Sequence, residues 1–274
     1  MKRRNFFKLG AAAAGLGLAR VTLEPWWLET RRVTIELDSL PPELDGITIA
    51  QLSDLHRGPW VPEALLRNGL EAARNLGADM IVLTGDFLSV SASYAPSLVA
   101  LVSELRAPLG VYAVLGNHDL WVRGREPLAR GFARHGIQLL INRAVQLRHR
   151  GAAFWVVGVD DCWAGRPDLA LALRDVPADQ FRLLLAHEPD FADLAASFGV
   201  PLQLSGHSHG GQVRLPLLGP VVLPPHGRKY PMGLYRLASG TQVYTNVGLG
   251  VVSPPIRLGC PPELSHLTLR SRPA

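Results

Sequence analysis

The sequence is poor in cysteine, and this scarcity narrows the chemistry that the chain can perform. Its 274 residues include two cysteines, Cys162 and Cys260, which lie far apart and belong to no Cys-x-x-Cys or Cys/His spacing. A structural zinc site built on thiolates is therefore not expected. The two thiols could join as a disulfide in an exported protein, but two free thiols are the simpler expectation.

Long apolar segments are missing from the N-terminus, and repeats are missing from the rest of the chain. The apolar stretch at residues 9–19 is too short for a membrane-spanning helix, which needs roughly 17 to 25 residues. Hydrophobic residues make up 47% of the chain, which is enough to form a core. The sequence predicts one folded domain over residues 33–271.

Acidic residues are absent from residues 1–20, which carry five basic residues and account for the net charge of +5. The remaining chain is balanced, with 23 basic and 23 acidic residues and no strong cluster of Lys and Arg. A protein that binds the phosphate backbone of nucleic acid needs such a cluster. No nucleic-acid partner is therefore expected.

The N-terminus resembles an export signal. Its basic start is followed by an apolar stretch and by small residues, Gly17 and Ala19, which could precede a cleavage point. The letters RRNFFK resemble the twin-arginine motif, whose route exports folded proteins. We expect residues 1–20 to be a twin-arginine-type signal, or a membrane anchor if uncleaved, and residues 21–32 to be a linker. The export machinery would then be a partner, and the protein would work in the cell envelope or periplasm, with membrane association possible. The alternative is that residues 1–20 form a short amphipathic helix.

Strand-like and helix-like segments alternate through the first two thirds of the domain. Short runs rich in Val, Ile and Leu, bounded by turn residues, occupy 47–54, 79–86, 110–119, 153–161, 181–190 and 201–209. Helix-like segments occupy 62–77, 95–107 and 126–136. This alternation predicts an α/β domain in which helices cover a sheet. The proline-rich last third excludes a long helix, and we expect it to contribute a second sheet.

Polar side chains that bind metals well follow five of the apolar runs directly. They are Asp54 with His56, Asp86, Asn117 with His118 and Asp119, His187, and His207 with His209. Because ligands bind outside the carboxyl ends of strands in open α/β sheets, these residues predict one shared site. Residues two apart on an extended chain project to the same side, so each Asp-x-His or His-x-His pair is expected to aim at one small volume.

The number and type of these ligands indicate two ions. Oxygen and imidazole ligands suit Mn, Fe, Zn or Ni, and the seven of these nine residues other than His118 and Asp119 already exceed what one ion needs. Two divalent ions about 3.5 to 4 Å apart, sharing one carboxylate, fit that number. The two divalent ions and the two carboxylates of Asp54 and Asp86 would together carry a net charge of +2, which attracts a phosphate.

Each motif alone has an ordinary structural explanation. An Asp-x-His is often a capped turn, Gly-Asn-His-Asp can end a strand, and His187 could be a hydrogen-bonded core histidine. The paired imidazoles of GHSHGG are harder to explain by packing, because three glycines accompany them. All five motifs in this order, each at the end of an apolar run, favour a site over these explanations.

The order DLH, GD, GNHD, AHEPD and GHSH, over residues 48–209, resembles that of the calcineurin-like metallophosphoesterases. The resemblance implies a four-layer αββα sandwich with two mixed sheets and a dinuclear metal site at strand ends. It implies that one ion is held by Asp54, His56, Asp86 and His209, and the other by Asp86, Asn117, His187 and His207. It further implies that His118 faces the scissile phosphate and that Asp119 orients it, the two acting as the catalytic residues. Manganese is the expected metal, with zinc, iron, nickel or magnesium as alternatives.

The C-terminal third is similar to a bacterial branch of this family with N-terminal export or membrane segments. That branch includes exported phosphoesterases and UDP-2,3-diacylglucosamine pyrophosphatases of lipid A-type synthesis. The expected function is hydrolysis of a phosphodiester in a phosphorylated small-molecule, cell-envelope or lipid-linked substrate, with the pyrophosphatase reaction as the alternative. A metal-free scaffold is a more remote alternative, because every metal ligand of the family pattern is present. A nuclease is also more remote, because the domain carries no net charge. Arg57 departs from the apolar residue of many relatives and is expected to affect only the substrate rim.

Overall fold

The computed structural model describes residue 21 and residues 23–272, so the predicted signal or anchor at residues 1–20 lies outside the described residues. The strands of its two large sheets are β1 (Glu29–Leu37), β2 (Thr48–Leu52), β3 (Met80–Leu83), β4 (Val111–Ala113), β5 (Ile137–Leu139), β6 (Arg143–His149), β7 (Ala152–Gly158), β8 (Arg182–Leu185), β9 (Leu202–Ser205), β12 (Gly233–Arg236), β13 (Gln242–Thr245) and β14 (Glu263–Ser271). The α-helices are α2 (Glu63–Asn75), α3 (Ala95–Val102), α4 (Asn117–Trp121), α5 (Arg125–Arg134), α6 (Leu169–Leu173) and α7 (Ala192–Ser197). Short 3₁₀ turns are η1 (Glu24–Trp26), η2 (Pro42–Leu44), η3 (Ala92–Tyr94), η4 (Pro189–Phe191) and η5 (His209–Gly211).

The first sheet has the strand order β1-β14-β2-β3-β4-β5. Strands β2 to β5 run parallel, and the chain passes through α2, α3 and α5 between successive strands. Parallel neighbours require such crossovers, which place the helices on one face of the sheet. The long strand β14 is antiparallel to β2 and parallel to β1, so this sheet is mixed.

The second sheet has the order β12-β13-β9-β8-β7-β6 and is also mixed. Its four central strands are parallel, and an antiparallel strand lies at each edge. The sequence placed this sheet in the last third of the chain, but it begins at Arg143, and the last strand, β14, joins the first sheet. That expectation was wrong because pairing partners are chosen by contacts between distant segments, which the local alternation of β14 does not encode.

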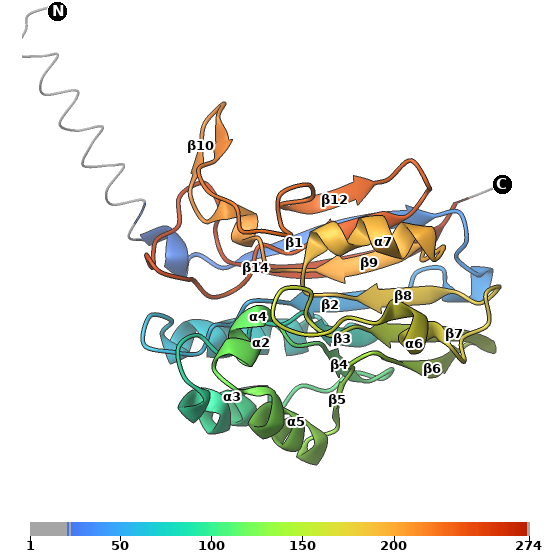
Figure 1. Ribbon diagram of the computed structural model, residues 1–274, viewed down its shortest axis with the longest axis horizontal. Coiled ribbons are helices and arrows are strands. Elements are labelled where there is room, and N and C mark those ends of the chain that lie inside the picture. Colours follow the sequence, from blue (N-terminus) through green and yellow to red (C-terminus); the bar gives the residue numbers. More distant parts are fainter. Residues whose placement is uncertain (1–20, 22, 273–274) are drawn as a thin grey trace, which may run out of the picture.

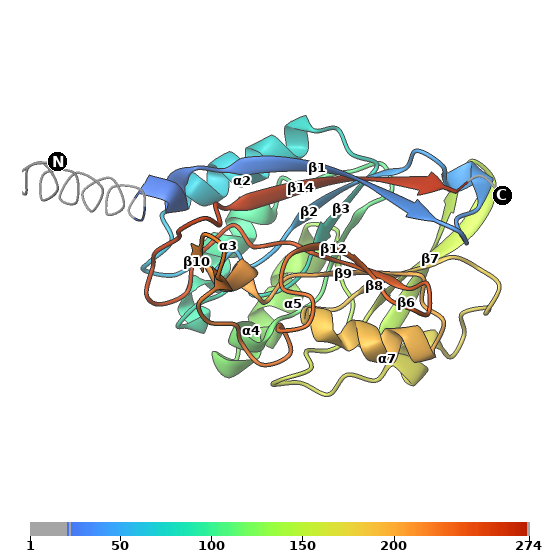
Figure 2. The same cartoon turned by 90° about the horizontal axis from the view of Figure 1, so that it is seen from above.

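Alternating side chains divide the interior into three layers of apolar contacts. On β3, Ile81 and Leu83 pack against α2, α3 and α5, whereas Met80 and Val82 face the second sheet. On β8, Leu184 belongs to a third cluster that includes residues of α6 and α7. Figure 2 shows α2 and α7 on opposite sides of the molecule. The predicted four-layer αββα sandwich is therefore confirmed.

The helix and domain boundaries differ from the sequence in detail. Helix α2 follows Pro62 and is followed by Gly77 at φ +63°, close to the predicted bounds of 62–77. Helix α3 was predicted to reach residue 107, but it ends at Val102, where the chain forms a turn. Residues 29–32 were assigned to a linker, yet they form the start of β1 and pair with β14, so the domain begins earlier. Both cysteines are free thiols, in agreement with the simpler expectation. Among the described residues, no helix is both long and apolar enough to cross a bilayer.

Candidate metal centre

The predicted metal ligands lie in loops at the carboxyl ends of β2, β3, β8 and β9, and at the start of α4. In Figure 1 the arrowheads of β8 and β9 point towards the end of the molecule where α4 lies. Five of these ligands have left-handed backbone: Asp54, His56, Asp86, His207 and His209, with φ between 45° and 69°. The predicted strand alternation is therefore not what aims the paired ligands. Left-handed backbone at non-glycine residues costs on the order of 1–3 kcal/mol each and gathers at functional sites.

Three groups of side chains converge: one joins His118 to His56 and Asp86, and the other two consist of predicted metal ligands alone. One ligand atom from each of Asp54, His56 and His209 lies within 4.8 Å of the others, and the same holds for the group of Asp86, His187 and His207. The two histidines of GHSH thus belong to different groups, in the arrangement that the resemblance implied. Almost all of these side chains are fully buried.

Asp86 lies between the two groups. Its Oδ2 atom is 3.5 Å from Nε2 of His56 in the first group and 3.3 Å from Nε2 of His187 in the second. One carboxylate in contact with both groups is the arrangement that two neighbouring cations share. Its other oxygen, Oδ1, accepts a hydrogen bond of 2.9 Å from the backbone N–H of His118.

Buried polar atoms without partners test whether cations fit here. Among the described residues, Oδ1 of Asn117 and Nε2 of His187 are buried at the site and have no hydrogen-bond partner. Leaving such atoms unpaired costs roughly 1–3 kcal/mol each, so native proteins rarely do so without a ligand. In the first group, Nε2 of His56 and Nε2 of His209 lie 3.0 Å apart. The donor set therefore fits two divalent cations.

Two histidines are oriented through their other ring nitrogen. Nδ1 of His187 lies 2.6 Å from the carbonyl oxygen of Thr84, and Nε2 of His207 lies 2.8 Å from that of Pro225. A ring N–H that donates to a carbonyl fixes the tautomer and leaves the opposite nitrogen with a free lone pair. His187 thus presents Nε2, and His207 presents Nδ1, to the second group.

The charges of the chain itself prepare these residues to bind cations. Burial lowers the pKa of His56 to about 3 and also lowers that of His207, so both imidazoles are neutral ligands. Burial alone would raise the pKa values of Asp54 and Asp86, but His209 and His187 respectively outweigh it, and both carboxyls are ionised. Burial opposes a charge on His187, yet Asp86 prevails and raises its pKa. A cation at Nε2 of His187 would therefore compete with a proton for the same nitrogen.

His118 and Asp119 follow Asn117 in the first turn of α4. The ring of His118 is partly exposed, packs edge-on against the ring of His56 at 4.8 Å, and places Nδ1 at 3.3 Å from the carbonyl oxygen of Ser89. The carboxyl of Asp119 accepts hydrogen bonds from the backbone N–H groups of Gly116 and Leu88. Asp119 therefore positions His118 through the backbone of the turn, and the contact to the ring comes from Ser89.

Glycines allow the two sheets to approach each other at this point. A Cβ atom at Gly116 would lie 2.2 Å from Oδ1 of Asp86, and one at Gly206 would lie 2.3 Å from Oδ2 of Asp54. Both contacts are shorter than real Cβ atoms make, so a larger residue would displace a ligand. Gly210 and Gly211 have positive φ and turn the chain after His209.

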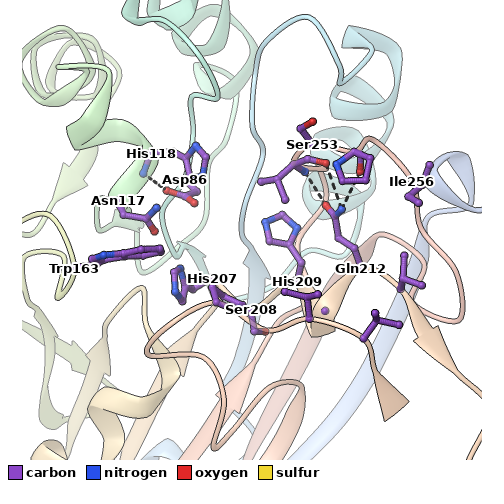
Figure 3. A pocket seen from close by; sticks show the side chains of 17 residues that line it. Asp86, Asn117, His118, Trp163, His207, Ser208, His209, Gln212, Ser253 and Ile256 are labelled. Atoms are coloured by element: carbon purple, nitrogen blue, oxygen red, sulfur yellow. Dashed lines mark hydrogen bonds between the residues drawn. The ribbon is translucent and has the colours of Figure 1, made fainter. Parts of the chain in front are cut away.

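A pocket of about 430 Å³ opens directly on the ligands. Figure 3 shows Asp86, Asn117, His118, Trp163 and His207 on one side, and Gln212, Ser253 and Ile256 on the other. Further lining residues are mostly apolar and include Val213, Val221, Val222, Val252 and Pro254. The amide of Gln212 bonds the backbone of Val252 and Pro254, which fixes the far wall.

Sequence reasoning missed the aromatic side of this pocket. The rings of Trp121 and Trp163 meet edge to face at 4.9 Å, and Trp163 also lies 5.8 Å from the ring of His207. The backbone N–H of Trp163 bonds Asp161 and Glu188. The run at 153–161 also ends in two carboxylates, Asp160 and Asp161, and that shared pattern could have indicated a role beside the site.

Comparison with known proteins identifies the fold and the site together. Residues 47–211 match the calcineurin-like phosphoesterase family, a span that covers more than half of the chain. The chain belongs to this family. The uncharacterized metallophosphoesterase YkuE of Bacillus subtilis (strain 168) is 36% identical over 289 aligned positions, which cover 99% of this chain and 98% of YkuE. The phosphodiesterase YaeI of Escherichia coli (strain K12) is 31% identical, over 98% of this chain and 99% of its own.

A solved structure agrees at the level of the fold. The protein TT1561 of Thermus thermophilus has a TM-score of 0.52 and 16% identity, covering 74% of this chain and 90% of that protein. The predicted family and fold class are thus confirmed. This metallophosphoesterase is an enzyme that hydrolyses phosphoester bonds, as the sequence predicted.

Proposed function

We propose that the protein is a dinuclear metal-dependent phosphodiesterase whose substrate carries an apolar group, such as a lipid-linked phosphodiester of the cell envelope. The observation that carries this proposal is the pocket, because its apolar wall begins directly beside His207 and His209. A site that accepted only small polar phosphates would gain nothing from a wall of valine and proline. The relative YaeI, named as a phosphodiesterase, supports the reaction type.

The residues have distinct roles in this proposal. Asp54, His56 and His209 would hold one ion, and Asn117, His187 and His207 would hold the other, with the carboxylate of Asp86 between the two groups. Manganese is the proposed metal. When bound, the ions supply Lewis-acid polarisation of the phosphoryl oxygens and a water of lowered pKa. His118, partly exposed beside Asp86, donates a hydrogen bond or a proton to the leaving oxygen.

A mixed metal and substrate screen tests the proposal. The wild-type protein should hydrolyse bis(p-nitrophenyl) phosphate with Mn²⁺ and should prefer a phosphodiester with an acyl chain over its short-chain analogue. Asp86→Ala removes the carboxylate common to both groups and should lower the rate by at least about a thousandfold, with loss of bound metal by elemental analysis. A matched control, Asp179→Ala, changes an exposed carboxylate and should leave both readings unchanged. Wild-type activity in Asp86→Ala would refute the assignment.

A nucleotide-linked lipid pyrophosphate, as in UDP-2,3-diacylglucosamine, is the second candidate. The half-exposed rings of Trp121 and Trp163 beside the pocket favour it, because such rings can stack on a nucleobase. Trp163→Leu should then raise KM for the nucleotide lipid but not for an acylated phosphodiester. An equal effect on both substrates would exclude base stacking.

Export by the twin-arginine route is part of the same proposal, because the RRNFFK motif precedes the domain. Replacement of Arg3 and Arg4 by Lys should then retain the protein in the cytoplasm. Fractionation of cells into cytoplasm, membrane and envelope measures this. Unchanged fractionation of the variant would contradict the route without affecting the proposed reaction.

A further inference from the structure

A small hairpin stands away from the two large sheets beside the metal centre. Its strands, β10 (Arg214–Leu215) and β11 (Gly219–Pro220), pair only with each other (Figure 1). Leu217, in its turn, is fully exposed, and Leu218 is 80% exposed. Two adjacent leucines in water are not explained by packing within the described chain. Apolar groups of this kind, next to a site, usually meet a partner surface.

The backbone at the hairpin turn strengthens this point. Leu217 has φ +67°, a conformation in which a side chain is disfavoured and glycine or asparagine is usual. A glycine at this position would make the turn without strain. The turn itself therefore does not require the leucine side chain, which lies in solvent.

A second exposed apolar element lies at the same end of the molecule. Leu23, Trp26 and Trp27, in and around η1, are all more than half exposed. Figures 1 and 2 both place this turn at the end that carries β10. One segment holds both elements: the backbone N–H of Arg214 bonds the carbonyl of Leu258, and the backbone N–H of Cys260 bonds the carboxyl of Glu24. We call Leu23, Trp26, Trp27, Leu217 and Leu218 the apolar rim.

The charge around the hairpin points to the chemistry of the partner. Between Asp193 and Glu263 the chain contains no acidic residue. Of the five basic residues in this interval, Arg257 is buried and Lys229 and Arg236 pair with Asp193 and Asp38, which leaves Arg214 on the hairpin and the exposed Arg228. The hairpin therefore emerges from a segment without carboxylates that would be repelled by lipid phosphates. Tryptophan and leucine side chains accompanied by basic residues are the combination that enters the headgroup region of a bilayer.

We propose that the apolar rim docks the enzyme onto a phospholipid bilayer. The exposed side chains of Val221 and Val222, directly after the hairpin, also line the pocket. They therefore connect the hairpin to the wall of the pocket. A lipid phosphodiester could then enter the pocket without crossing water, a step that rests on the proposed function. The docking itself does not depend on the reaction.

Binding to vesicles tests the docking. Full-length and metal-loaded protein is mixed with vesicles of equimolar phosphatidylcholine and phosphatidylglycerol, and the bound fraction is measured by flotation. The double substitution Leu217→Ser with Leu218→Ser should weaken binding by about tenfold or more, which corresponds to about 1.4 kcal/mol. Leu217→Gly alone should weaken binding while leaving the melting temperature equal or higher. The matched control, Leu194→Ser, changes a half-exposed leucine on α7 and should bind as wild type.

Hydrolysis of soluble bis(p-nitrophenyl) phosphate separates the two proposals. The double variant should retain it, because Leu217 and Leu218 do not line the pocket. Wild-type protein that hydrolyses this substrate but does not float with vesicles would overturn the docking alone. Protein that floats but hydrolyses no phosphodiester would overturn the proposed function alone. A wild-type dimer by light scattering that becomes a monomer in the double variant would assign the rim to a second copy and also overturn the docking.

Discussion

His118 differs from the surrounding histidines in its exposure and in its contacts. It is partly exposed at the pocket, whereas His56, behind it, is fully buried. Its backbone N–H binds Asp86, and its ring is held by Ser89 and His56. His118 thus lies beside the metal centre and also faces the pocket, so its position suits action on a substrate rather than a structural role.

Replacement of His118 by Asn should lower kcat by roughly 10²- to 10⁴-fold, the range of general-acid contributions. Metal content should stay at the wild-type level, because the two buried groups remain intact. Steady-state kinetics and elemental analysis measure the two effects. Loss of metal together with activity would instead assign His118 as a ligand.

Residue identity was predictable here, but residue conformation was not. The five motifs indicate Asp54, His56 and the other ligands because each motif is short and continuous in sequence. Their left-handed backbone depends on tertiary contacts, such as the hydrogen bond of 2.9 Å from the backbone N–H of Asp54 to the carbonyl of Gly85. A pattern of residue types carries no signal for such contacts.

At the scale of elements, two loops shape the pocket although they contribute no metal-ligating residue. Glu188 accepts hydrogen bonds from the backbone of Cys162 and Trp163 and so fixes the aromatic wall. Arg257, fully buried, donates to the carbonyls of Val247, Gly248, Gly250 and Cys260 and so ties the opposite loop together. The sequence could not show these roles, because the partners are backbone atoms brought together by folding.

The loop that carries Trp163 should make stability depend on pH. Burial and the neighbouring Glu188 raise the pKa of Asp161 to about 8, whereas an unfolded aspartate has a pKa near 4. Folding therefore takes up a proton in this interval, and the stabilisation present below about pH 4 is lost as the pH rises towards 8. Asp161→Asn removes this loss. Between about pH 4 and 8, the unfolding free energy of the wild type should therefore fall by a few kcal/mol more than that of the variant, since one pKa unit corresponds to about 1.4 kcal/mol.

Urea unfolding of chelator-treated protein at several pH values between about 4 and 8 measures this difference. Asp175→Asn, at an exposed carboxylate, serves as the control and should follow the wild-type profile. Parallel profiles for the wild type and Asp161→Asn would show that Asp161 is ionised in the fold.

At the scale of the whole molecule, the centre joins the two sheets. Asp54, His56 and Asp86 follow strands of the first sheet, and His187, His207 and His209 follow strands of the second. Their convergence was predictable from the strand-end rule and from the family resemblance. The sheet that each late strand joins was not, because the return of β14 to β2 depends on pairing across more than 200 residues of chain.

Removal of the ions should therefore destabilise the entire domain. An ion that binds only the folded chain adds about 2.7 kcal/mol at a concentration one hundred times its dissociation constant. For a domain of this size that corresponds to a fall in Tm of roughly 5 to 10 °C on chelation. Calorimetry with and without EDTA measures it, and Asp86→Ala should show a much smaller shift. Equal melting temperatures for wild type with and without metal would contradict the prediction.

The separation of the ligands along the chain also determines when the metal can be chosen. His56 and His209, whose ring nitrogens lie 3.0 Å apart, are 153 positions apart in sequence. No short segment of the nascent chain offers a complete set of ligands, so selection among ions waits for the finished fold. The metal pool of the compartment in which the chain folds then decides which ion is captured. For an enzyme exported already folded, the metal would therefore be selected in the cytoplasm and not in the compartment where the enzyme works.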